Sequence, residues 1–216
     1  MADSDDDATQ LSAQALAALQ EFYQEQSNLE ENMTGALTGD VEKFNPKEDW
    51  QLSQFWSDDA TAERLTKEAL AVAGENGRIA CVSCPTTYKK IRELKGDGVQ
   101  AFCLEFDERF KVFGEHFVFY DYNEPLRLPV EFKNSFDLVL VDPPFLSEEC
   151  LSKMAITVRY LMKDKVLLCT GAVMAEAADR LLGVKLTKFV PKHTHQLQNE
   201  FRCYTNYDSF DLDKND

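Results

Sequence analysis

The stretch with the clearest chemical potential is Asp142-Pro143-Pro144-Phe145, which directly follows an apolar run typical of a buried strand. Proline has no backbone N–H and a fixed φ, so two consecutive prolines end the strand and stiffen the turn after it. The Asp142 carboxylate and the Pro143 carbonyl can then accept two hydrogen bonds from one amino group, which leaves its nitrogen lone pair free to react. Phe145 can stack on a flat base or cover a cationic ammonium. In a plainer interpretation, Asp142 only caps a strand-ending turn.

The chain that must position this turn alternates between strand and helix. Apolar runs predict five strands, at residues 79–84, 100–106, 117–121, 136–142 and 165–170. Helical periodicity predicts helices at residues 58–73, 86–95, 147–162 and 173–182, with a short helical turn near 108–113. This alternation favours an α/β fold with a mostly parallel sheet, right-handed crossovers and helices on both faces. Two further runs, 184–190 and 201–207, have no helix between them and predict an antiparallel C-terminal hairpin.

The segment before the first predicted strand contains a helix, a linker and a group of aromatic residues. Residues 11–26 have apolar side chains at helical spacing and predict an amphipathic helix, which a flexible linker at 27–47 follows. Ser57 is the expected N-cap of the helix at 58–73. Just before it, Phe55 and Trp56 either form a lid over a pocket or pack against that helix.

Charge is distributed unevenly along the 216 residues, whose formal net charge is −15. Residues 1–49 hold 12 acidic and 2 basic side chains, and residues 208–216 hold 4 acidic and 1 basic, so residues 50–207 are nearly neutral. We therefore expect an acidic N-terminal extension (1–49), one folded domain (50–207) and an acidic C-terminal tail (208–216). Acidic ends repel phosphate backbones and favour a basic protein partner.

No secretory signal and no run of about 20 apolar residues is visible, so we expect a cytoplasmic protein. Most of the six cysteines lie in apolar runs, which is typical of reduced, buried thiols. Cys81 and Cys84 have the spacing of a redox or zinc pair, but no second pair accompanies them. His193 and His195 lack further ligands at metal-site spacing, so we predict a polar loop there and no metal.

Five segments resemble one small family of class I methyltransferases; they are Trp50–Trp56, Glu105–Phe110, Phe119–Asn123, Asp142–Phe145 and Asn199–Tyr204. The family was first labelled adenine-N6 DNA methyltransferases because of its Asp-Pro-Pro-Phe/Tyr signature, and it includes lysine N-methyltransferases of translation elongation factor 1-alpha. The resemblance implies a seven-stranded Rossmann-like methyltransferase domain at residues 50–207 and S-adenosyl-L-methionine as cofactor. It also implies transfer of a methyl group to an amino nitrogen, with elongation factor 1-alpha as the basic protein partner.

In this fold the loop after the first strand holds the cofactor, and in the family pattern that loop is rich in glycine. Here the loop, residues 82–88, contains no glycine, which departs from the pattern. The cofactor-binding candidates in it are Ser83, Pro85 and Thr86, at the start of a predicted helix that offers N–H groups and hydroxyls.

The resemblance also implies roles for polar residues at the ends of the second and third strands. Glu105 and Asp107 share strand parity, and a carboxylate there can accept hydrogen bonds from both ribose hydroxyls; we favour Asp107 because it ends the strand. Asp121, with Tyr122 beside it, is the candidate for binding the adenine amino group. Solvated charges at strand ends, or simple turn chemistry before Pro125, are the alternatives.

Two other functions fit parts of the sequence. A nucleic-acid adenine-N6 methyltransferase would use the same turn on a base taken out of the stack, but it needs a positive groove. The only clustered basic candidates are Lys185, Lys188, Lys192, His193 and Arg202. A non-catalytic binding module would explain the glycine-free loop, whereas the intact Asp142 turn opposes it. The resemblance favours lysine methylation.

Overall fold

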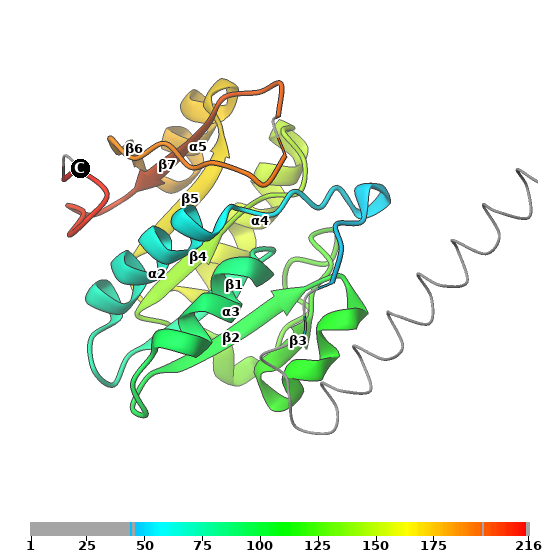
Figure 1. Cartoon of the computed structure of the whole chain (residues 1–216), viewed down its shortest axis with the longest axis vertical. Helices are drawn as coiled ribbons and strands as arrows, with labels where there is room; N and C mark the ends of the chain where they lie inside the picture. Colours follow the sequence, from blue (N-terminus) through cyan, green and yellow to red (C-terminus); the bar gives the residue numbers. More distant parts are fainter. Residues whose placement is uncertain (1–43, 45, 196, 215–216) are drawn as a thin grey trace, which may run out of the picture. The chain divides into compact units, whose positions relative to one another are not determined.

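The computed structural model describes residue 44 and residues 46–195 and 197–214 (Figure 1). The chain from Lys47 onwards forms one compact unit. The helix predicted at 11–26 and most of the predicted linker lie outside the described residues.

The described chain contains one seven-stranded sheet in the order β3-β2-β1-β4-β5-β7-β6 (Figure 1). Its strands are β1 Arg78–Val82, β2 Gln100–Glu105, β3 Phe117–Phe119, β4 Leu138–Val141, β5 Val166–Gly171, β6 Lys185–Leu186 and β7 Phe201–Thr205. Strands β1 to β5 pair in parallel, whereas β7 is antiparallel to both β5 and β6. The predicted α/β fold, a mostly parallel sheet closed by an antiparallel hairpin, is confirmed.

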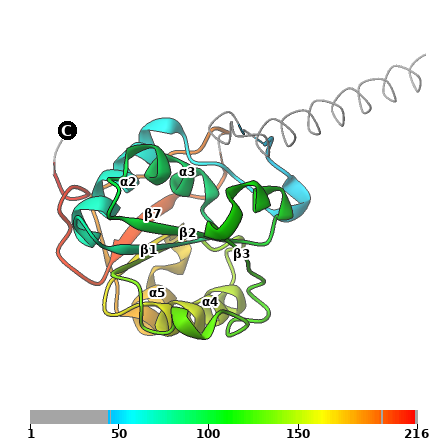
Figure 2. The same ribbon diagram turned by 90° about the horizontal axis from the view of Figure 1, so that it is seen from below.

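Helices cover both faces of this sheet (Figure 2). Helices α2 (Asp59–Ala73) and α3 (Pro85–Leu94) lie on one face, and α4 (Glu148–Leu161) and α5 (Ala175–Leu182) lie on the other. Short 3-10 helices connect these elements; they are η2 Trp50–Leu52, η3 Glu108–His116, η4 Val130–Phe132 and η5 Ala172–Met174. Because both faces are covered, β4 and β5 are buried at every position, as their unbroken apolar runs require.

The N-cap of α2 is Asp58, one residue after the predicted Ser57. The Asp58 carboxylate accepts a hydrogen bond from the Thr61 N–H at 2.7 Å, which satisfies a free donor of the first turn. Ser57 instead forms an isolated antiparallel bridge with His193. Gly74, at a φ of 75°, ends the helix in a conformation that glycine adopts without strain.

The last predicted hairpin is shorter on one side than its apolar pattern indicates. The run at 184–190 yields only the two residues of β6, Lys185 and Leu186. The N–H and hydroxyl of Thr187 still donate to the Cys203 carbonyl of β7. The N–H of Lys188 donates to Asp213 instead, so pairing along β7 ends at Thr187.

The C-terminal residues, predicted as an acidic tail, pack against α2 as far as they are described. The N–H groups of Phe210 and Asp211 donate to the two carboxylate oxygens of Glu68, at 3.1 and 2.7 Å. Asp211 also pairs with Arg64 at 2.5 Å, and Leu212 is buried. Acidic composition therefore coincides here with ordered packing.

All six cysteines are buried and none forms a disulfide. No helix within the described ranges has the length and apolar character needed to cross a membrane.

Candidate active site

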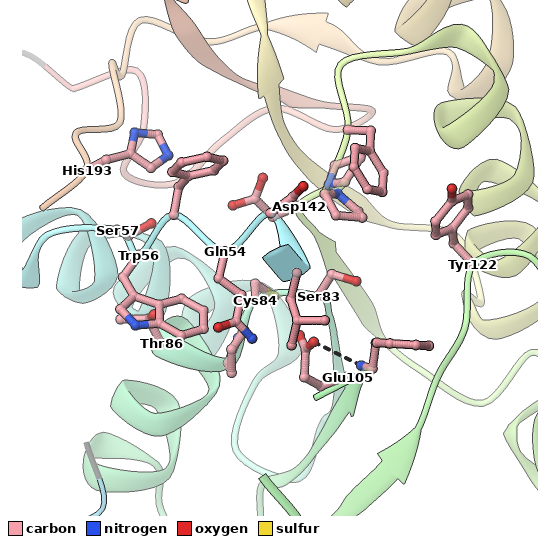
Figure 3. Close-up of a pocket in the computed structure, with 18 of the residues that line it drawn as sticks. Gln54, Trp56, Ser57, Ser83, Cys84, Thr86, Glu105, Tyr122, Asp142 and His193 are labelled. Carbon is pink, nitrogen blue, oxygen red and sulfur yellow. Dashed lines mark hydrogen bonds between the residues drawn. The ribbon is translucent and has the colours of Figure 1, made fainter. Parts of the chain in front are cut away.

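A cavity of about 670 Å³ opens at the carboxyl ends of β1, β2 and β4 (Figure 3). Its walls come from those strand ends, from the segment before α2 and from the loop before β7. All but one of the predicted site residues line it: Phe55, Trp56, Ser83, Pro85, Thr86, Glu105, Asp121, Tyr122, Asp142, Pro143, Pro144 and Phe145. The exception is Asp107. The parallel sheet thus gathers at one edge residues that are scattered along the chain.

The loop after β1 turns without a glycine because Ser83 itself adopts a left-handed conformation, with a φ of 55°. The Ser83 N–H donates to the Leu104 carbonyl of β2 at 2.9 Å, which holds the turn against the sheet. Helix α3 then begins at Pro85, and its N-cap Cys84 accepts no hydrogen bond through its side chain. Thr86 and Thr87 therefore bring a positively polarised helix N-terminus to the cavity wall.

Glu105 ends β2 and presents a buried carboxylate to the cavity (Figure 3). Its Oε1 accepts hydrogen bonds from the N–H groups of Phe106 and Asp107, at 2.9 and 3.1 Å. No hydrogen bond from the described residues reaches Oε2, so this oxygen can accept from a ligand. Burial, with a smaller contribution from the Asp107 charge, raises the pKa of Glu105 to about 7.

Asp107, the residue favoured from sequence for the ribose, does not line the cavity. Its carboxylate accepts hydrogen bonds from Arg109 Nε and from Gln54 Nε2, the latter at 2.7 Å. Burial alone would raise the pKa of Asp107, but these hydrogen bonds outweigh it and lower the pKa. Strand parity predicted that both carboxylates point toward the pocket, but β2 ends at Glu105, and beyond it Arg109 occupies the Asp107 carboxylate.

Asp142 lies where β4 ends, and its N–H donates to the Val82 carbonyl of β1 at 3.1 Å. Burial raises the pKa of Asp142 to about 8, with a further contribution from the charge of Glu105. The side chain of Phe145 is 44% exposed, and its ring packs edge-on against Tyr122 with 5.8 Å between the ring centroids. The Asp-Pro-Pro-Phe turn thus places a carboxyl group with high proton affinity beside an aromatic wall.

Asp121 serves in a turn and also lines the cavity, so the two alternatives from the sequence are compatible. Its Oδ1 accepts a hydrogen bond from the Asn123 N–H at 2.8 Å. Tyr122 lies beside Lys153, whose ammonium is 5.5 Å from the centre of the tyrosine ring.

Phe55 and Trp56 reach the cavity from the segment before α2. Trp56 packs edge-on against Phe110 at 6.0 Å between ring centroids, so it both lines the cavity and contributes to packing. Its carbonyl accepts a hydrogen bond from the Thr194 N–H at 2.9 Å, which joins the segment to the loop before β7.

Sequence reasoning missed several residues of the cavity wall, chiefly Gln54, His193, Leu197, Gln198, Asn199 and Phe201. His193 was interpreted as part of a polar loop, yet its ring packs against Phe201 at 4.6 Å and burial lowers its pKa. The available signals were the resemblance of segment Trp50–Trp56, which contains Gln54, and of segment Asn199–Tyr204 to the methyltransferase family. Among the described residues, no group of three or more His, Cys, Asp or Glu could hold a metal ion.

The cavity fits S-adenosyl-L-methionine in size and in chemistry. Its volume of about 670 Å³ lies in the range of small-molecule sites. The N-terminus of α3 suits the carboxylate of the cofactor, Glu105 Oε2 suits its ribose hydroxyls, and the half-exposed Phe106 offers an aromatic wall for its adenine. The buried Glu105 carboxylate aimed into the cavity is the observation that a bound ligand best explains.

Residues 48–209 match the protein family described as "Probable N6-adenine methyltransferase". The chain belongs to this family. It is 55% identical over 214 residues to human EEF1A lysine methyltransferase 1, a match that covers 97% of each chain. It is also 38% identical over 227 residues to the yeast protein-lysine N-methyltransferase EFM5, with 92% of each chain covered.

Solved structures show the same fold at low sequence identity. A branched-chain polyamine synthase from Thermus thermophilus aligns with a TM-score of 0.55 at 14% identity, over 76% of this chain and 59% of that one. A predicted O-methyltransferase from Agrobacterium tumefaciens aligns with a TM-score of 0.50 at 13% identity, over 66% of this chain and 78% of that one. The predictions of a Rossmann-like methyltransferase fold and of S-adenosyl-L-methionine as cofactor are confirmed.

Proposed function

We propose that this enzyme transfers a methyl group from S-adenosyl-L-methionine to a lysine side chain of translation elongation factor 1-alpha in the cytoplasm. The observation that carries the choice of substrate is the acidic composition of the cavity wall, whose carboxyl groups ionise more readily beside a bound cation. Glu105, Asp121 and Asp142 line it, whereas no lysine or arginine is among its described lining residues. A cationic side chain is attracted to such a wall, and a phosphate-bearing nucleotide is repelled.

The residues of the Asp-Pro-Pro-Phe turn orient the substrate nitrogen. The cofactor supplies an electrophilic methyl group on a sulfonium. The Asp142 carboxylate and the Pro143 carbonyl accept the N–H groups of the lysine, so that its lone pair points along the transfer axis. Positioning of this kind can lower a barrier by up to roughly 7–11 kcal/mol. The ring of Phe145, half exposed against Tyr122, covers the ammonium and its methylated product.

A lysine must lose a proton before its nitrogen can attack, and its ordinary pKa is about 10.4. Transfer from water into the partly enclosed cavity favours the neutral amine. Asp142 has a pKa of about 8, raised by burial, so its proton affinity is far closer to that of an amine than that of an ordinary carboxylate. We assign to Asp142 both the hydrogen bond to the nitrogen and the first acceptance of its proton.

Adenine-N6 methylation uses the same turn chemistry, and the family description names that reaction. Of the basic residues that the sequence offered for a nucleic-acid groove, Lys185, Lys188, Lys192 and Arg202 do not line the cavity. His193 does line it, but burial lowers its pKa and so disfavours its charged form. The relatives that match nearly the whole chain are named protein-lysine methyltransferases. We further infer that residues 50–207 are the catalytic domain and that residues 1–49 are an extension to it.

The experiment that tests the proposal supplies methyl-labelled cofactor to the purified protein with either elongation factor 1-alpha or adenine-containing DNA and RNA. We expect label in the elongation factor that survives nuclease, is lost with protease and maps to lysine by mass spectrometry. Label that enters only the nucleic acid would replace the lysine function by the adenine one. Binding of cofactor without transfer to any of the three would indicate a binding module.

A further inference from the structure

The segment of residues 47–57, which we call the strap, includes η2 and crosses the carboxyl ends of the sheet before α2 begins (Figure 1). Seven consecutive residues of the strap, from Gln51 to Ser57, line the cavity. The strap contains no regular strand and only the single short turn of η2, so contacts with its neighbours must hold it in place. Backbone contacts of Trp56 and Ser57 hold its C-terminal end, and two side-chain anchors hold the rest.

One anchor ties the strap to the end of β2 through Gln54, which is 6% exposed. Gln54 Nε2 donates to Asp107 Oδ2 at 2.7 Å, and Gln54 Oε1 accepts from Arg109 Nη2 at 2.9 Å. Oε1 also accepts from the Asp49 N–H at 2.9 Å, which fixes the strap's own turn. The Gln54 amide thus uses a donor and an acceptor on two charged partners at once.

The partners of Gln54 are joined directly to the cofactor end of the cavity. Asp107 pairs with Arg109 at 2.6 Å, and the Asp107 N–H donates to Oε1 of Glu105. Arg109 Nη1 donates to the Lys47 carbonyl at 3.1 Å, so the same pair also holds the first residue of the strap. Asp107 thus connects Gln54 to the Glu105 carboxylate, which faces the cavity.

The other anchor ties the strap to the loop before β7. Glu48 Oε1 accepts from the Thr194 hydroxyl at 2.8 Å, and Glu48 Oε2 contacts His195 Nδ1 at the same distance. The strap is therefore held at both edges of the cavity, and Gln54 is the strap side chain that hydrogen-bonds to Asp107 and Arg109, the residues that follow Glu105.

We propose that Gln54 is a positioning residue that latches the strap to Asp107 and Arg109, closing the cofactor end of the cavity. This inference rests on the proposed use of the cavity for S-adenosyl-L-methionine. The latch slows departure of the cofactor and keeps Phe55 and Trp56 over the site. A hydrogen bond to a charged group, once lost, changes an equilibrium by about tenfold or more.

The test uses a reciprocal exchange of hydrogen-bonding groups. Gln54→Glu keeps the shape and the acceptor oxygens but puts a carboxylate against Asp107, so the latch should open. Asp107→Asn alone weakens the pair with Arg109. In the double variant Gln54→Glu/Asp107→Asn, the amide at position 107 donates to the carboxylate at position 54. That carboxylate also pairs with Arg109, which already lies within 2.9 Å of it.

The readout is the dissociation rate of S-adenosylhomocysteine, measured by stopped-flow fluorescence, together with hydrogen exchange of the strap. We expect Gln54→Glu to raise the dissociation rate about tenfold and to speed exchange at residues 47–57, while the double variant restores both to within about threefold of the unchanged protein. Glu108→Gln is the control, because its exposed carboxylate follows Asp107 directly but pairs with Lys111 and does not line the cavity.

A double variant that dissociates as fast as Gln54→Glu would overturn the latch, since Gln54 would then act on the cofactor directly or on folding alone. Equal rates in all four proteins would overturn it as well. These outcomes are separate from the proposed lysine function, because that function is judged by methyl transfer to elongation factor 1-alpha by the unchanged protein.

Discussion

Glu105 and Asp142 lie at the same level of the sheet on either side of Ser83. Leu104 and Val141 both pair with Val82, so each carboxylate is the first residue beyond a partner of β1. The charge of Glu105 adds to burial in raising the pKa of Asp142 to about 8. Two carboxyl groups with raised pKa values therefore face one cavity, and a cation bound between them favours the ionised form of both.

This arrangement predicts that binding of the cofactor releases protons. At about pH 7 the Asp142 carboxyl, with a pKa of about 8, is mostly protonated in the free protein. A sulfonium nearby favours its ionised form, so up to about one proton leaves on binding of S-adenosyl-L-methionine. Calorimetry in buffers of different ionisation enthalpy measures this release, which should vanish above about pH 9 because the group is already ionised there. S-adenosylhomocysteine, which has no sulfonium charge, should release fewer protons. Equal release by both ligands would contradict the prediction.

Asp142→Asn is predicted to separate binding from chemistry. The amide retains the shape of the side chain and can still accept one hydrogen bond, but it cannot take a proton from the substrate. We expect methyl transfer to fall by about 10²–10⁴-fold, as when a general base is lost, while S-adenosylhomocysteine binds within a few-fold of normal. Single-turnover transfer and calorimetry give the two quantities. Normal turnover of this variant would remove Asp142 from the mechanism.

Glu105→Gln is predicted to weaken cofactor binding without affecting the fold. Loss of a charge-assisted hydrogen bond costs about 1.5–3 kcal/mol, so the Kd for S-adenosylhomocysteine should rise by about 10- to 150-fold. Glu108→Gln is the matched control, because its carboxylate is 64% exposed and pairs only with the exposed Lys111 among the described contacts. Similar Kd values for the two variants would show that Glu105 does not bind the cofactor.

The left-handed backbone at Ser83 predicts an unusual tolerance for glycine. Ser83→Gly removes the steric cost of a φ of 55° and adds chain entropy, so the free energy of unfolding should change by less than about 1 kcal/mol. Ser83→Val should lower it by about 1–3 kcal/mol, because β-branched residues are strained at positive φ. Urea denaturation measures the free energy of unfolding of both variants. Ser57→Val is the comparison, since the φ of Ser57 is not positive. Equal losses at the two positions would argue against strain at Ser83.

Most of the fold could be predicted from the sequence, because a sheet covered on both faces requires an alternation of apolar runs and amphipathic helices. The positions of Asp142 and Glu105 in the site could also be predicted, since residues at the carboxyl ends of parallel strands meet at one edge of the sheet regardless of the loop conformations. The two prolines in particular marked the end of β4.

The contacts that the sequence could not reveal are those between loops. The Gln54–Asp107 hydrogen bond joins residues 53 positions apart, and neither residue belongs to a periodic element. The bridge between Ser57 and His193 likewise depends on two irregular segments meeting. Local patterns report propensity and burial, whereas the preference for Asp107 over Glu105 depended on where Arg109 would fold back.

The position of Phe201 in the cavity wall has a consequence for biosynthesis. The chain is made from its N-terminus, so the strap and all five parallel strands leave the ribosome before the loop and the β7 strand that complete the site. A nascent chain without β7 lacks the part of the cavity wall that Phe201 supplies, although the residues assigned to the cofactor are already made. Insertion of β7 between β5 and β6 is thus the last step in building the cavity wall, and a bound cofactor stabilises that finished state further.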